Sequence, residues 1–331
     1  MKSKKLWAKL IFVAVLILLI IYVLRDSAGP IFKQLKNTSV WILIAVCVSS
    51  VIYHMIEAWI TYSLAKRYNP GFRYVRAVGC AFYCSFYRLA TLGSGSGVAA
   101  VYFLGRNGVE YSKGTGLYMI QYVVHKVSIA LFSGVLFLIN WHFMVMNYHE
   151  YEVYLGLAYG LTIIIAIALI LVSVSRKVHE LLLKLVFLLN KSGKLDSIAA
   201  KLEESCNILS DTTSELLKEK GMLFSLVLKN FIKCCFWYGI PFIVLYGTGT
   251  ITLLQSLAVC SLAVMTAAVI PTPAGIGALE LIMTTLIGVV AGVDMGGATM
   301  LIYRFATFVF PFIVGGVYIL LTKNGKRLHQ S

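Results

Sequence analysis

Hydrophobic residues in this sequence are gathered into long blocks that contain few or no charged side chains. An α-helix needs about 20 consecutive, mainly apolar residues to cross the hydrocarbon core of a bilayer. The blocks therefore predict an all-α, polytopic membrane protein with about six full spans, at residues 10–24, 40–64, 115–140, 155–174, 222–246 and 299–321.

The composition agrees with a membrane protein. Of the 331 residues, 59% are hydrophobic and 13% are charged, whereas soluble domains have about 45–50% and about 25%. A soluble globular fold is therefore not expected. The seven cysteines show no disulfide or zinc spacing, and we expect no metal and no cofactor.

The formal charge is +15, from 29 Lys and Arg against 14 Asp and Glu. In a soluble protein this balance would suggest nucleic-acid binding, but in a membrane protein basic residues gather in the cytoplasmic loops. If the basic N-terminus is inside, the segments after 40–64 and after 299–321 are also inside, and both are basic. We therefore expect both termini to be cytoplasmic and most of the charge to reflect topology.

Two further apolar stretches are interrupted by small or helix-breaking residues. The first, 77–104, contains the run Gly-Ser-Gly-Ser-Gly at 93–97 and is too short for two full spans. It predicts a re-entrant hairpin, which is tolerated where protein or a watery cavity satisfies the freed backbone groups. The second, 250–293, is broken at 271–277 and predicts a hairpin from the opposite face, with two complete spans as the alternative.

Residues 40–140 and 222–321 thus each read as a span, an interrupted hairpin and a span, in reversed orientations. This is the pattern of an inverted repeat, and interrupted segments at corresponding places in two halves point to a transport site near the membrane midplane. We expect a single integral membrane domain over 1–331. It also contains an N-terminal span and loop at 1–39 and a cytoplasmic amphipathic loop at 176–220.

A small set of ionisable side chains lies inside the predicted spans, where a charge without a partner is costly. His54 and Glu57 share one helix face, as do Gln121 and His125. The alternative for each charged group is an internal ion pair or a side chain that extends to the lipid headgroups. The candidates for ligand binding are Arg88, Lys126, Lys229, Lys233, Glu280 and Arg304.

Arg88 is the strongest of these candidates, because a guanidinium group binds phosphate bidentately and this one lies beside the first break. Gly93, Gly95 and Gly97 could add backbone N–H groups to such a site, although small residues also permit close helix packing. The sequence presents no phosphate-binding, dinucleotide or zinc-protease motif. We therefore assign no catalytic residue and favour a protein that is not an enzyme.

The second break carries a family resemblance. Its sequence, Pro-Thr-Pro-Ala-Gly-Ile-Gly-Ala-Leu-Glu at 271–280, resembles the Pro-x-Pro-Gly-Gly-x-Gly-x-x-Glu signature of the lysylphosphatidylglycerol synthase transmembrane family. Ala274 replaces the first Gly of the usual pair. Residues 301–305, followed by Pro311, resemble the last conserved span of the family, and 88–108 are similar to its first break without the usual Pro. The resemblance covers essentially the whole chain.

The resemblance implies re-entrant helices and movement of a phospholipid between the leaflets of a bacterial inner membrane. In full-length relatives, a separate soluble domain transfers lysine from lysyl-tRNA to phosphatidylglycerol. Because no such domain follows the last predicted span, we do not expect this chain to perform the transfer alone. We expect a flippase-like transporter whose partner is a membrane phospholipid, such as phosphatidylglycerol or its lysyl ester.

In this interpretation, Arg88 holds the lipid phosphate, Glu280 meets a cationic headgroup, and Arg304 pairs with Glu280 when the site is empty. Gly93, Gly95 and Gly97 would contribute to the same headgroup site. Further headgroup candidates are Lys126, Lys229 and Lys233. The residues that form the hinge at the second break are Pro271, Pro273, Gly275 and Gly277.

Two alternatives stay open. The first is a phosphatidylglycerol lysyltransferase, or another enzyme that modifies lipid headgroups, acting alone or with a separately encoded transferase. Lysyl-tRNA would then be a partner, and it is the one nucleic acid we would expect. The second is a non-transporting partner of another membrane enzyme, which would dock through residues 176–220. A homo-oligomer is left open in each case.

Overall fold

The computed structural model of the chain describes residues 33, 36–175, 177–178, 180–181, 184, 196–270, 272 and 275–328. The predicted first span at 10–24 lies outside these residues, as do Pro271 and Pro273 of the predicted hinge. Every regular element in the described part is helical. The prediction of an all-α fold is therefore confirmed.

Within the described residues, five helical segments are long and apolar enough to span a membrane, which confirms a polytopic membrane protein. Each lies at a predicted span. Helix α3 covers Val40–Tyr68 and α6 covers Tyr111–Ile139. The other three segments are Trp141–Val174, Lys220–Val244 and Val293–Thr322.

These three segments are composite. The first joins α7 (Trp141–Tyr148) and a short 3-10 turn to α8 (Glu152–Val174). The second joins α11 (Lys220–Tyr238) to α12 (Ile240–Val244). The third consists of α15 (Val293–Arg304), a π-helix (Phe305–Val309) and α16 (Phe310–Leu328).

The segment between the predicted spans 115–140 and 155–174 contains a short helix. Trp141–Tyr148 is helical, and Met144 and Tyr148 are buried in the hydrophobic core. The hydroxyl of Tyr148 also donates to the carbonyl of Leu286, at 2.9 Å. A segment with one apolar face and such an anchor gains more from packing as a helix than from remaining a loop.

Both interrupted stretches form hairpins of short helices. The first hairpin consists of α4 (Tyr74–Ala90) and α5 (Ser96–Arg106), and the second of α13 (Leu253–Val269) and α14 (Ala278–Ala291). The longest arms have 17 residues, or about 25 Å at 1.5 Å per residue. This is less than the roughly 30 Å of a hydrocarbon core. Re-entrant arms are therefore favoured over complete spans at both places.

The two breaks depend on glycine. Gly93 has φ 95° in the first break, and Gly275 and Gly277 have φ 68° and 88° in the second. These positive values are readily adopted only by glycine. Leu92, next to Gly93, also has a positive φ, of 52°, which is uncommon for a residue with a side chain.

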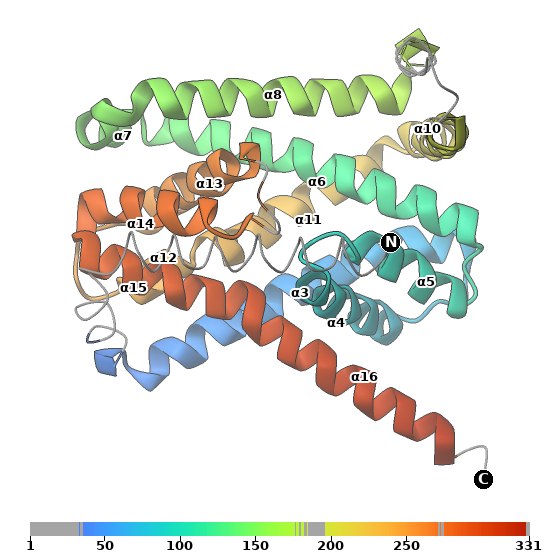
Figure 1. Cartoon of the computed structure of the whole chain (residues 1–331), viewed down its shortest axis with the longest axis horizontal. Helices are drawn as coiled ribbons and strands as arrows, with labels where there is room; N and C mark the ends of the chain where they lie inside the picture. Colours follow the sequence, from blue (N-terminus) through green and yellow to red (C-terminus); the bar gives the residue numbers. More distant parts are fainter. Residues whose placement is uncertain are drawn as a thin grey trace.

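The two halves exchange contacts in a symmetrical way. The first arm of each hairpin packs against the last span of the other half, α4 against α16 and α13 against α6. Three spans, α3, α6 and α8, precede α11, so the second half enters the membrane from the opposite side to the first. Figure 1 shows the two hairpins at opposite ends of the long axis of the molecule. This arrangement agrees with the predicted inverted repeat.

The contact between α4 and α16 is close because small residues lie in it. A Cβ atom on Gly315 would lie 2.3 Å from the carbonyl oxygen of Phe82, and one on Gly79 would lie 2.3 Å from the hydroxyl of Tyr318. Phe86 of α4 also stacks on Phe312 of α16, with ring centroids 4.8 Å apart. Hairpin one is thus fixed to the final span.

The predicted amphipathic loop at 176–220 contains α10 (Asp196–Leu217), whose apolar face is covered by protein. Cys206, Leu209 and Leu216 are buried, and α10 packs against α6, α8 and α11. Gly116 of α6 permits this approach, since a Cβ there would lie 2.0 Å from the hydroxyl of Thr212. The apolar face of α10 therefore packs against the other helices of the protein.

Candidate functional site

A polar cavity of about 300 Å³ lies between α3, hairpin one and α6. Polar and ionisable side chains at membrane depth are costly, so their concentration around one cavity marks a candidate functional site. The polar residues that line it include Glu57, Ser85, Arg88, Gln121, His125 and Lys126.

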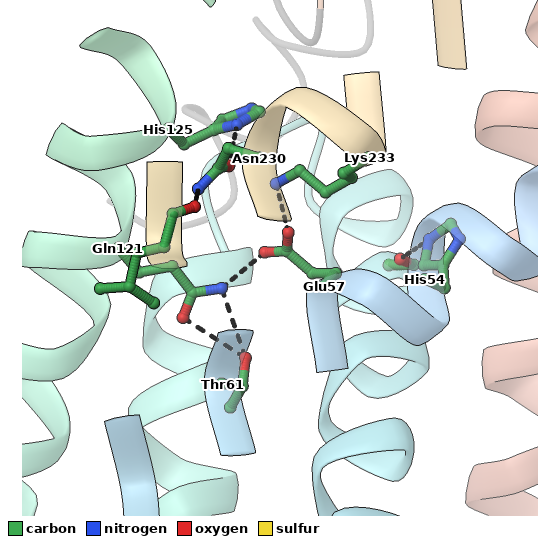
Figure 2. A network of polar contacts seen from close by, with 9 residues as sticks. His54, Glu57, Thr61, Gln121, His125, Asn230 and Lys233 are labelled. Atoms are coloured by element: carbon green, nitrogen blue, oxygen red, sulfur yellow. Dashed lines mark hydrogen bonds and ion pairs between the residues drawn. The ribbon is translucent and has the colours of Figure 1, made fainter. Parts of the chain in front are cut away.

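Glu57 of α3 is the centre of the network beside this cavity (Figure 2). Lys233 of α11 donates to Glu57 Oε2 at 2.5 Å, and Gln121 of α6 donates to Glu57 Oε1 at 2.6 Å. The side chain of Lys233 is only 1% exposed. Because burial without a partner would be very costly for an ammonium group, the pair joins α3 firmly to α11. Lys233 therefore forms the internal ion pair that was the alternative to headgroup binding.

Two histidines extend the network. The Nδ1 atom of His125 lies 3.0 Å from Asn230 Oδ1, and the Nδ1 atom of His54 lies 2.7 Å from the carbonyl oxygen of Ser50. Both oxygens can only accept, so each Nδ1 carries the hydrogen. His54 Nε2 lies 2.9 Å from the hydroxyl of Ser85 on α4. The face of α3 with His54 and Glu57 and the face of α6 with Gln121 and His125 thus contribute to one polar network.

Arg88 reaches the cavity from the last turn of α4 and has aromatic neighbours. Its guanidinium carbon lies 5.9 Å from the ring centroid of Trp237 and 5.6 Å from that of Phe308. Among the described residues, no carboxylate forms an ion pair with Arg88. Lys126 also lines the cavity, and its Nζ atom lies 5.5 Å from the centroid of the Tyr122 ring.

The cavity therefore carries an excess of positive charge. Glu57 is balanced by Lys233, while Arg88 and Lys126 have no acidic partner in the part of the chain that the structure describes. Interactions between charges are strong where water is scarce. The arrangement is chemically suited to an anion with several oxygen atoms, such as a phosphate, which guanidinium groups bind bidentately.

A second charged centre lies at the break of hairpin two. Arg304 donates to both oxygens of Glu280, through Nε at 2.6 Å and Nη2 at 3.1 Å, and Nη2 also donates to the carbonyl of Gly275 at 2.7 Å. The backbone N–H of Gly277 donates to Glu280 Oε2 at 2.7 Å. The predicted pairing of Arg304 with Glu280 is confirmed. This cluster attaches the second break to the final span.

Not all predicted site residues meet at the cavity. Lys229 donates to the hydroxyl of Ser63 at 2.8 Å and lies over the ring of Trp59, away from the cavity lining.

The glycines of the first break also lie outside that lining. Gly93 N–H donates to the carbonyl of Arg88, and Gly95 N–H donates to the hydroxyl of Thr91, both at 2.7 Å. Gly97 permits close packing, since a Cβ there would lie 2.7 Å from the ring of Tyr118. The expected supply of N–H groups to a phosphate is therefore wrong for Gly93 and Gly95, because the turn itself uses them.

Three functional neighbours were missed in the sequence. Asn230 shares a face with Lys233, three residues away, and this spacing could have revealed it. Trp237 and Phe308 were indistinguishable from other aromatic residues in apolar blocks. Their position over a charged group depends on how α11 and the π-helix pack, which the spacing of residues does not encode.

The sequence of this chain has a match among known families. The family described as the lysylphosphatidylglycerol synthase TM region matches residues 6–315. A search of curated proteins finds no match.

Proposed function

The chain belongs to the lysylphosphatidylglycerol synthase TM family, and we propose that it moves a phospholipid between membrane leaflets. The substrate class is phosphatidylglycerol or its lysyl ester. The membrane is the bacterial inner membrane, with both termini on the cytoplasmic side. The proposed path places the headgroup in the polar cavity and leaves the acyl chains in the surrounding lipid.

The observation that carries this proposal is the unequal pairing of the cations at membrane depth. Lys233 and Arg304 each have a carboxylate partner, at 2.5 and 2.6 Å. Arg88 has none among the described residues. The cavity beside it is also lined by Lys126, which has no carboxylate partner in the same part of the chain. Because a buried cation without a counter-ion is costly, these two favour a ligand that brings its own negative charge.

A phosphodiester can meet these requirements. The planar guanidinium of Arg88 can donate two parallel hydrogen bonds to phosphate oxygens, and Lys126 can add a point charge. The lysyl ester also carries two amino groups, and a carboxylate is the matching partner for their positive charge. Glu280 is the proposed acceptor, and Arg304 would leave it when the lipid arrives.

Purified protein in vesicles that contain fluorescent phosphatidylglycerol tests the function. A membrane-impermeant reductant destroys the label in the outer leaflet, so any further loss reports movement of lipid. We expect protein-containing vesicles to lose nearly all of the fluorescence, and protein-free vesicles to lose about half. A loss of only about half in the protein-containing vesicles, with labelled phosphatidylglycerol and with its labelled lysyl ester, would contradict the proposal.

The family description names a synthase, which favours lysyl transfer as the second candidate function. Lysine would move from lysyl-tRNA to a hydroxyl of phosphatidylglycerol, with release of the free tRNA. Incubation of the purified chain with labelled lysyl-tRNA and phosphatidylglycerol vesicles distinguishes the two functions. Labelled lipid would support the enzyme, and we expect none unless a separate transferase is added.

A further inference from the structure

Hairpin one has a second face, opposite to the polar cavity. An elongated groove of about 890 Å³ lies there, between α4, α5 and α16. Its middle is lined by Tyr83, Tyr87, Phe103 and Tyr318. The rings of Tyr83 and Phe103 are 5.3 Å apart, and those of Phe103 and Tyr318 are 6.4 Å apart. The floor of the groove is therefore a continuous aromatic surface built from three helices.

The groove is polar at one end. Helices α4 and α16 run antiparallel, since Gly79 approaches Tyr318 while Phe86 stacks on Phe312. Thr322, beyond Tyr318, therefore lies at the end away from the break of the hairpin. Arg106, in the last turn of α5, lines the same end. The opposite end, at the break, is formed by Thr91 and Gly95.

Arg106 is an exposed cation at this polar end. Its Nη1 donates to the hydroxyl of Tyr102 at 3.3 Å, and its guanidinium carbon lies 5.7 Å from the centroid of that ring. No acidic side chain pairs with it within the part of the chain that the structure describes. The guanidinium is held in place by the tyrosine but keeps most of its hydrogen-bond donors.

The lipid-facing side of the hairpin leaves the groove open. Val98 is 75% exposed and Tyr102 is 46% exposed, and both line it. In a bilayer these surfaces meet acyl chains. The basic end of the hairpin is also the end that we place in the cytoplasm, where anionic headgroups attract arginine.

We propose that this groove binds one acyl chain of an anionic phospholipid of the cytoplasmic leaflet, with the lipid phosphate on Arg106. The acyl chain lies along the aromatic floor, and its end approaches the break. It thus points from the cytoplasmic leaflet toward the membrane midplane. This site is separate from the polar cavity. Lipid binding in the groove does not depend on movement of lipid through the cavity.

Phosphatidylglycerol with a photoreactive group near the end of one acyl chain tests the proposal. After irradiation of the full-length protein in vesicles, mass spectrometry locates the labelled peptides. We expect label on residues 87–98, which flank the break, in at least a fivefold excess over the exposed face of α8 around Ile164, which is 63% exposed. Equal labelling of the groove and of α8 would contradict the proposal.

Two variants separate the parts of the site. Arg106→Gln should reduce the labelling severalfold with phosphatidylglycerol but little with phosphatidylcholine. Val98→Trp should cover the groove and reduce labelling with both lipids. Because Val98 is 75% exposed, we expect this variant to fold like the wild type. Lys66→Gln is the matched control, because Lys66 lies over Tyr62 at 5.5 Å with the same four-residue spacing. Loss of label in Lys66→Gln equal to that in Arg106→Gln would overturn the assignment to Arg106.

Discussion

Arg88 and Arg304, one from each half of the protein, lie over the same aromatic ring. Their guanidinium carbons are 5.6 and 5.1 Å from the ring centroid of Phe308. Phe308 belongs to the π-helix Phe305–Val309 in the final span, and such bulges occur frequently at functional sites. The charged cluster of the second break and the polar cavity of the first are therefore connected through one side chain.

Replacement of Phe308 by Leu should weaken lipid movement without unfolding the protein. Leu keeps an apolar side chain but removes the ring that both guanidinium groups face, and each cation–π contact contributes about 0.5–2 kcal/mol. We expect a reduction in the rate of lipid movement of roughly 3- to 30-fold, measured in vesicles by the fluorescence assay. Phe305→Leu is the control, since Phe305 lies in the same π-helix and no Lys or Arg of the described residues lies over its ring. Equal rates in wild type and Phe308→Leu would show that the ring does not matter.

The pair between Glu57 and Lys233 should be mainly structural. Removal of one partner leaves a buried charge without compensation, which costs about 3–5 kcal/mol. Lys233→Met should therefore lower the thermal midpoint of the detergent-purified protein strongly, and the double variant Glu57→Gln with Lys233→Met should recover much of the loss. Thermal unfolding followed by intrinsic fluorescence provides the measurement. A double variant as unstable as the sum of the single variants would show that the two residues are not coupled.

The docking of α10 should depend on pH through Glu215. The hydroxyl of Tyr68 donates to this carboxylate at 2.8 Å and lowers its pKa, and Lys113 at 3.5 Å acts in the same direction. Because the pKa in the folded protein is below the ordinary value of 4.5, the stabilisation is present above that value and is lost as the pH falls through the folded pKa. Glu215→Gln should thus be less stable than wild type at pH 7, and this difference should shrink as the pH falls below 4.5, measured by thermal unfolding. A difference that persists unchanged at pH 3 would contradict this assignment.

The orientation of the halves can be tested by labelling of single cysteines. In a variant without the native cysteines, Asn147→Cys lies at the end of α7 and Ser112→Cys at the start of α6. A membrane-impermeant maleimide added to intact cells should label Asn147→Cys and should label Ser112→Cys only after the membrane is permeabilised. The reverse pattern would place both termini outside and contradict the topology.

Much of the fold could be predicted because the membrane restricts it. Span length and the distribution of basic residues identified the five spans and the two breaks. Arg304 and Glu280 could be paired in advance, since few groups at membrane depth are able to satisfy an arginine.

The rest depends on packing between distant segments. Residues 141–148 contain polar groups, and only the contact of Tyr148 with Leu286 explains why they fold as a helix. The backbone N–H groups of Gly93 and Gly95 appeared available in the sequence, but the turn at the first break uses them. The roles of Phe308 and Trp237 likewise follow from positions that residue spacing does not determine.

In the proposed function, the positive charge of Arg88 binds the lipid phosphate. The rate of phosphatidylglycerol movement in vesicles measures the effect of this charge. Arg88→Gln should reduce this rate at least tenfold, while Arg88→Lys should retain part of it because the charge is kept. Arg76→Gln, an exposed arginine on the same helix, should move lipid at the wild-type rate. A wild-type rate in folded Arg88→Gln would contradict the account.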